Sequence, residues 1–172
     1  MENSIEYRYE KYGAICLANW FISRGFEVGL SVPGPIIDLR KRESIGGIVP
    51  PELSEFDTND PQTRYKIYYD TPGNIDLVAR NNEKIWVIEA KGLTKGRGAP
   101  GSIAEAIGQI TMLIDLNLND YIYGILLPKE DRYTNAVNKI SDTNPLLSRQ
   151  DFCVFWISEN GEISRDTRFS VV

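Results

Sequence analysis

The segment from Ile75 to Lys91, IDLVARNNEKIWVIEAK, constrains the fold of this chain more than any other stretch. Two apolar runs rich in β-branched and aromatic residues flank Asn81-Asn82, and asparagine tolerates the positive φ of a tight turn. The segment therefore predicts a β-hairpin with strands over 75–80 and 84–91. Away from its charged turn the hairpin is apolar on both faces, except for two acids and one lysine at its open end.

The register of this hairpin decides which side chains share a face. A two-residue turn places Asp76 opposite Val87, so Asp76, Glu89 and Lys91 project from one face. Asp76 and Glu89 are then diagonal neighbours, about 6–8 Å apart at the backbone. A four-residue loop preserves the shared face, whereas a three-residue loop sends Asp76 to the other. The opposite face is predicted to be core and holds Ile75, Leu77, Ala79, Trp86, Ile88 and Ala90.

Helical and strand patterns alternate through the rest of the chain. Helices are predicted over about 4–24, 102–116 and 131–140, and further strands over 26–32, 64–69, 121–127 and 152–158. Gly25 supplies a left-handed stop for the first helix, and Ser102 with Glu105 forms a capping box for the second. This order predicts an α/β fold, with a mixed central β-sheet flanked by helices on both faces.

A Pro/Gly-rich stretch over about 33–63 interrupts this alternation. Five of the nine prolines fall in it, together with the basic run Arg40-Lys41-Arg42. Neither side of the stretch alone forms a convincing unit, so we interpret it as an insertion in a single domain spanning 1–172. The basic run is either a phosphate contact or a solvated turn.

The composition excludes several kinds of catalysis. The 172 residues include no histidine and two cysteines, which excludes histidine-dependent triads, HExxH metal sites and zinc fingers that need histidine. Catalysis must therefore rest on carboxylates, lysine, amides and hydroxyls. The net charge is −5, so any contact with nucleic acid requires a local basic patch. Without a signal peptide or a run of ~20 apolar residues, the chain is expected to be cytoplasmic and to have no membrane partner.

Asp76 and Glu89 interrupt otherwise apolar strands. Two converging carboxylates repel and raise each other's pKa unless a cation lies between them. Carboxylate oxygens with backbone carbonyls and water suit Mg²⁺ or Mn²⁺ rather than zinc. The structural alternative is a lysine that pairs with two acids at a strand end.

The order of Asp76 on one strand and Glu89-Ala90-Lys91 on the next resembles the signature of the PD-(D/E)xK nuclease superfamily, which has the restriction-endonuclease-like fold. The resemblance covers roughly residues 5–127, the insertion aside. It implies an Mg²⁺-dependent endonuclease that hydrolyses phosphodiester bonds, in a restriction, repair or phage-defence context. Asp76, Glu89 and the Ala90 carbonyl would hold Mg²⁺, for which Mn²⁺ can substitute. Lys91 would orient or deprotonate the attacking water and stabilise the transition state.

The resemblance also implicates the two helices beside the hairpin. Members often carry a glutamine after the E-x-K triplet, which here is Gln109; it would position water or phosphate, unless it is merely solvated. Members also often place a glutamate on the first helix as a further metal ligand. Glu10 is preferred over Glu6 for that role, because it lies on an apolar edge of the helix.

The loop after Lys91, KGLTKGRGAPG, carries the predicted nucleic-acid contacts Lys95 and Arg97. Its glycines let backbone amides approach a phosphate, and it ends at a helix N-terminus that favours anions. DNA is favoured over RNA as the partner, and a homodimer is compatible with the resemblance. Two alternatives stay open: a non-catalytic nucleic-acid-binding or interaction subunit with the same fold, and an RNA nuclease.

Overall fold

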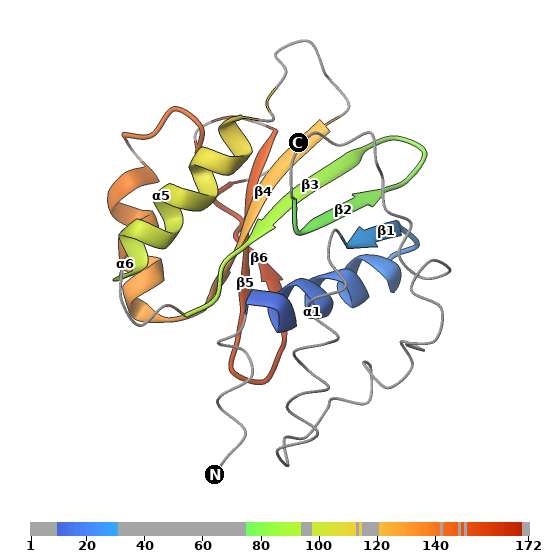
Figure 1. The fold of residues 1–172 in the computed structure, drawn as a ribbon, viewed down its shortest axis with the longest axis horizontal. Helices are drawn as coiled ribbons and strands as arrows, with labels where there is room; N and C mark the ends of the chain where they lie inside the picture. The colour runs from blue at the N-terminus through green and yellow to red at the C-terminus, as the bar shows by residue number, and fades with distance from the viewer. Residues whose placement is uncertain are drawn as a thin grey trace.

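A computed structural model describes residues 10–30, 75–93, 98–112, 114, 121–141, 143–147, 149 and 151–169. In this part of the chain three helices and six strands follow one another (Figure 1). They are α1 (Glu10–Ile22), β1 (Glu27–Leu30), β2 (Leu77–Arg80), β3 (Ile85–Ala90), α5 (Gly98–Thr111), β4 (Tyr121–Pro128), α6 (Asp131–Ser141), β5 (Phe152–Ile157) and β6 (Ile163–Arg165). The predicted insertion at 33–63 and the strand predicted at 64–69 lie outside the described residues, so the single-domain organisation stays a prediction.

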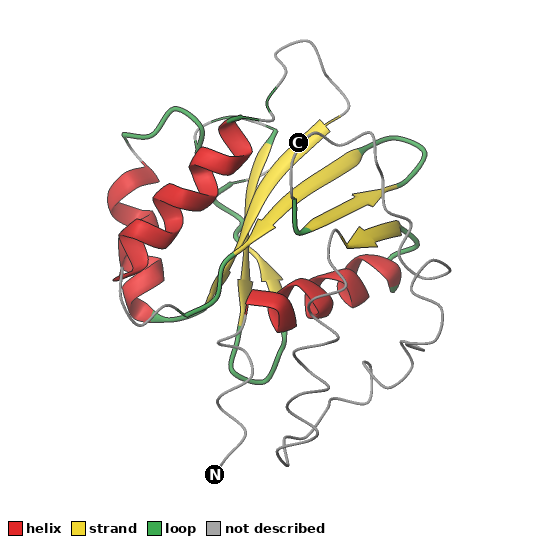
Figure 2. Cartoon of the chain, in the orientation of Figure 1, coloured by secondary structure: helices red, strands yellow, loops and turns green. Residues whose placement is uncertain are grey.

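The six strands form one mixed sheet in the order β1-β2-β3-β4-β5-β6. The pairs β1–β2, β2–β3 and β5–β6 are antiparallel, and the central pairs β3–β4 and β4–β5 are parallel. Figure 2 shows the strands as one curled sheet, with α1 apart from the other two helices. The predicted α/β class with a mixed sheet is therefore confirmed.

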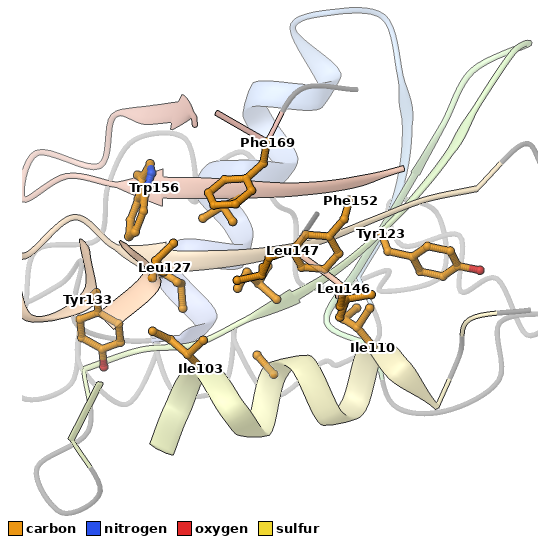
Figure 3. Close-up of a cluster of buried hydrophobic side chains, with 14 of the residues drawn as sticks. Ile103, Ile110, Tyr123, Leu127, Tyr133, Leu146, Leu147, Phe152, Trp156 and Phe169 are labelled. Atoms are coloured by element: carbon orange, nitrogen blue, oxygen red, sulfur yellow. The ribbon is translucent and has the colours of Figure 1, made fainter. Parts of the chain in front are cut away.

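Two hydrophobic clusters cover the two faces of this sheet. Ala14, Leu17 and Phe21 of α1 belong to one cluster, which includes Trp86, Ile88 and Ala90 of β3. The second cluster lies under α5 and α6, and Figure 3 shows Ile103 and Ile110 of α5 among its buried side chains. Val87 of β3 belongs to this second cluster, as the alternation of side chains along a strand requires. Helices thus flank both faces, as the sequence predicts.

The first helix ends at Ile22, slightly before the predicted end, and Gly25 supplies the left-handed stop that the sequence predicts. Gly25 has a φ of 81°, and the next amide, of Phe26, donates to the Phe21 carbonyl at 3.2 Å. The Gly25 amide donates to the Ile22 carbonyl at 2.9 Å. These two bonds form the Schellman arrangement that satisfies the last carbonyls of a helix.

The second helix begins earlier than the sequence predicts, and the predicted capping box is wrong. α5 starts at Gly98, so Ser102 lies inside the helix and is buried. Pro100 occupies the first turn, where a missing N–H costs no hydrogen bond. The buried face also starts earlier, because Ala99 precedes Ile103 at helical spacing. None of the helices described is long and apolar enough to cross a membrane.

Candidate functional site

The β2–β3 hairpin has a four-residue loop, so the predicted two-residue turn is wrong. Leu77 pairs with Ile88, and Arg80 pairs with Ile85. The Asn81 side chain accounts for the longer loop, because its Oδ1 accepts hydrogen bonds from the amides of residues 83 and 84, both at 2.9 Å. Such a side-chain bond mimics a backbone turn and stabilises the loop in place of a tighter one.

Extended by one residue beyond the Leu77–Ile88 pair, this register places Asp76 opposite Glu89 and not opposite Val87, which pairs with Val78. The change amounts to an even number of residues, so Asp76 and Glu89 keep the same face. Directly opposed residues lie about 4.5–5.5 Å apart at their Cα atoms, closer than the predicted diagonal pair. Asp76 Oδ2 also accepts a hydrogen bond from the Ala90 amide at 2.8 Å. The two acids therefore face each other across the open end of the hairpin.

The predicted place of Ile75 is wrong. Ile75 belongs to the cluster under α5, together with Val78 and Val87, and not to the cluster under α1 that holds Leu77. Ile75 lies two residues before β2 begins, where the chain no longer follows the alternation of the strand. The other five residues predicted for that core face do lie under α1.

Glu89 and Lys91 form a buried ion pair. Only 2% of Glu89 and 8% of Lys91 is exposed, and Lys91 Nζ donates to Glu89 Oε1 at 2.7 Å. The second carboxylate oxygen, Glu89 Oε2, is buried and has no hydrogen-bond partner within the described part of the chain. A buried carboxylate oxygen without a donor is costly, and a cation that binds it removes that cost.

The backbone around Lys91 is held by hydrogen bonds from β4 and α6. Its amide donates to the Leu126 carbonyl on β4 at 2.9 Å. The hydroxyl of the fully buried Tyr133 on α6 donates to the Gly92 carbonyl at 3.0 Å. These two bonds fix the point at which the chain leaves β3 and thereby position the lysine.

Two further carboxylates approach the ammonium from different helices. Glu10 Oε2 on α1 lies 4.0 Å from Lys91 Nζ, and Glu105 Oε1 on α5 lies 3.8 Å from it. Both glutamate side chains are partly exposed, 40% and 46% respectively. Glu105 is a site residue that the sequence does not indicate, because its spacing from Ser102 suggests a helix cap. The sequence feature that points to Glu105 is its position one helical turn before Gln109, because residues four apart lie on the same face of a helix.

Burial and neighbouring charges shift the pKa values of the ionisable groups in this site. Burial, reinforced by the charge of Glu89, raises the pKa of Asp76 from 3.8 to about 7. Burial also raises the pKa of Glu89, and its hydrogen bond with Lys91 only partly opposes this. For Lys91, burial lowers the pKa, but the hydrogen bond and charge of Glu89, with the charge of Glu10, outweigh it and raise the pKa. Lys91 therefore stays protonated, and ionisation of both facing carboxyls at once is unfavourable.

The structure brings four of the predicted site residues together: Glu10, Asp76, Glu89 and Lys91. Ala90 contributes its amide to Asp76, as given above, while its side chain lies in the α1 cluster. Gln109 lies on α5 with a buried Oε1 that has no hydrogen-bond partner among the described side chains. Glu6, Lys95, Arg97 and the basic run 40–42 lie outside the described residues.

The donor set fits a small divalent cation better than a transition metal. Among the residues that the structure describes, no three His, Cys, Asp or Glu side chains are grouped to hold a metal ion. Mg²⁺, however, needs only one or two carboxylates and keeps several of its waters. Two facing carboxyls, one with a buried oxygen that lacks a donor within the described ranges, meet that requirement. Comparison of the chain with protein-family models, curated proteins and solved structures finds no match.

Proposed function

We propose that this protein is an Mg²⁺-dependent nuclease that hydrolyses phosphodiester bonds in DNA, on a restriction-endonuclease-like fold. The observation that carries the proposal is the apposition of Asp76 and Glu89 at the open end of a hairpin, with the Lys91 ammonium 2.7 Å from Glu89. Among the described residues Glu89 Oε2 has no donor when both carboxyls are ionised, and its interaction with Asp76 then needs a shared proton. A divalent cation would take the place of that proton.

Asp76 and Glu89 would hold the cation, with the Ala90 carbonyl as a backbone ligand and Glu10 as a further carboxylate near it. When bound, the cation makes water a better nucleophile and offsets charge on the phosphate. The raised pKa of Asp76 supports this assignment, because a cation offsets both its burial and the charge of Glu89, the two effects that raise it most.

Lys91 would donate hydrogen bonds to the phosphate as negative charge develops on it. Its raised pKa favours this role over that of a general base, because a base must lose its proton near the working pH. Replacing Lys91 with alanine should lower the rate about 10²- to 10³-fold, the typical effect of removing one donor to developing charge. Gln109 would position water or phosphate from α5.

Lys95 and Arg97 would supply affinity for the nucleic-acid backbone. Both side chains attract the phosphate backbone whatever the base sequence is. Replacing both with alanine should therefore weaken nucleic-acid binding and reduce its salt dependence. The preference for DNA follows from the resemblance of the Asp76 and Glu89-Ala90-Lys91 pattern to DNA nucleases.

The test is a panel of supercoiled plasmid, linear duplex, single-stranded DNA and single-stranded RNA, incubated with the protein and either Mg²⁺ or EDTA. The proposal predicts cleavage of DNA with Mg²⁺ and none with EDTA. Binding to the same substrates is measured with Ca²⁺ in place of Mg²⁺. Cleavage confined to RNA would replace DNA with RNA as the substrate, and DNA binding without cleavage would favour the non-catalytic subunit.

A further inference from the structure

The Lys91 ammonium lies among carboxylates at unequal distances. Nζ is 2.7 Å from Glu89 Oε1, 3.8 Å from Glu105 Oε1 and 4.0 Å from Glu10 Oε2. Only the first distance is a hydrogen bond. The ammonium is therefore bound to the buried acid and stands just beyond hydrogen-bond reach of two half-exposed ones.

The Glu89 carboxylate can thus pair with either of two cations, the proposed divalent ion or the Lys91 ammonium. A divalent cation held by Asp76 and Glu89 and an ammonium held by Glu89 carry like charges, and they repel strongly in a poorly solvated site. The ammonium and the divalent cation must therefore compete, unless the ammonium has another carboxylate to move to.

Glu105 provides that alternative better than Glu10. Its carboxylate is the nearer of the two to Nζ, and it extends from α5, which packs on the face of the sheet that holds Val87. The charge of Glu10 acts on Glu89, so a cation at Glu89 draws Glu10 toward itself. Glu105 Oε1, 3.8 Å from Nζ, then becomes the nearest carboxylate for the ammonium.

We propose that Glu105 is a positioning residue, which takes the Lys91 ammonium when a divalent cation occupies Asp76 and Glu89. Lys91 then lies nearer the solvent side of the site, where a phosphate can reach it. The inference rests on the proposed metal-dependent function, and it gives Lys91 two positions: one that stabilises the metal-free site and one that serves the reaction.

The test is a double-mutant cycle on Mn²⁺ affinity, measured as free Mn²⁺ by electron paramagnetic resonance without substrate. Glu105→Gln should weaken Mn²⁺ binding about three- to fivefold, the effect of losing one half-exposed ion pair. Lys91→Met should strengthen binding, because the competing cation is gone. In the Lys91→Met background, Glu105→Gln should have no further effect.

The matched control is Glu83→Gln, which removes the same charge from the loop at the opposite end of the hairpin and should leave Mn²⁺ affinity unchanged. If Lys91→Met does not fold, Lys91→Gln serves as the second background, where the effect of Glu105→Gln should again shrink. An equal effect of Glu105→Gln in both backgrounds would show that Glu105 acts only through its charge, and overturn the proposal. So would no effect in the parent.

Failure of this inference and failure of the proposed function give different results. A parent that binds Mn²⁺ and cuts DNA, but shows no coupling between positions 91 and 105, overturns only the role of Glu105. A parent that binds no Mn²⁺ overturns both.

Discussion

Replacing Asp76 with asparagine should stabilise the metal-free protein, and only above weakly acidic pH. Burial and Glu89 raise the pKa of Asp76 from 3.8 to about 7, so the folded state binds the Asp76 proton more tightly than the unfolded state does. Stability from this group is fully present below pH 4 and is lost progressively as the pH rises to about 7. Asparagine is neutral throughout and can still accept the hydrogen bond of the Ala90 amide.

The magnitude follows from the size of the shift. About three pKa units at 1.36 kcal/mol each give an upper limit of about 4 kcal/mol. Asp76 is partly exposed, and solvent screening reduces the expected gain to about 2 kcal/mol. Because Asp76 and Glu89 titrate as a pair, the measured midpoint belongs to both.

The assay is urea unfolding of the parent and of Asp76→Asn in EDTA, at pH values from 4.5 to 8. The two proteins should be nearly equally stable at the acid end, and the variant should gain as the pH rises. Mg²⁺ at pH 8 should stabilise the parent and leave the variant unchanged. A difference that does not vary with pH, or a variant that is less stable at pH 8, would refute the raised pKa of Asp76.

Three further predictions concern the scaffold, each measured by urea unfolding. Gly124→Ala should cost about 1–3 kcal/mol, because the added Cβ would lie 2.6 Å from Cys153 Sγ; a loss below ~0.5 kcal/mol would show that β5 gives way freely. Gly25→Ala should cost only about 1 kcal/mol, since its φ is 81° but no atom lies within 4 Å of the added Cβ; a larger loss than for Gly124→Ala contradicts this. Tyr133→Phe should cost about 1–2 kcal/mol, since it leaves the buried Gly92 carbonyl unpaired; an unchanged stability contradicts that contact.

The shared face of Asp76 and Glu89 was predictable because it depends only on whether the hairpin loop has an even or an odd number of residues. Side chains alternate along a strand, so loops of two and four residues give the same result for both acids. The loop length itself was not predictable from the pair Asn81-Asn82, because the Asn81 side chain bonds to the following amides and extends the turn. The directly opposed pairing, which brings the acids closest, follows from that bond.

The helix contacts of the site were only partly predictable. Helical spacing placed Glu10 on an apolar edge, and the structure does bring it to Lys91. Glu105 was assigned to a cap because Ser102 precedes it by three residues, while Ala99 and Pro100 in fact continue the helix toward its N-terminus. Contacts across elements, such as Tyr133 with Gly92, have no local signal because they depend on how α6 packs.

The short strand β6 was missed for a related reason. Residues 163–165 are too few to show an alternating pattern. The strand forms because β5 offers it an edge: Trp156 pairs with Ser164. The buried Asp166 that follows accepts a hydrogen bond from Trp156 Nε1 at 2.9 Å.

The most direct test of the central claim compares Glu89→Gln with Glu83→Gln in the cleavage of supercoiled plasmid with Mg²⁺. Both changes remove one carboxylate from the same hairpin, but only Glu89 faces Asp76 and Lys91. The parent and Glu83→Gln should cut at the same rate, and Glu89→Gln should be slower by about 10²-fold or more. Equal rates for the two variants, or no cleavage by the parent with either Mg²⁺ or Mn²⁺, would contradict the assignment of this site to a nuclease.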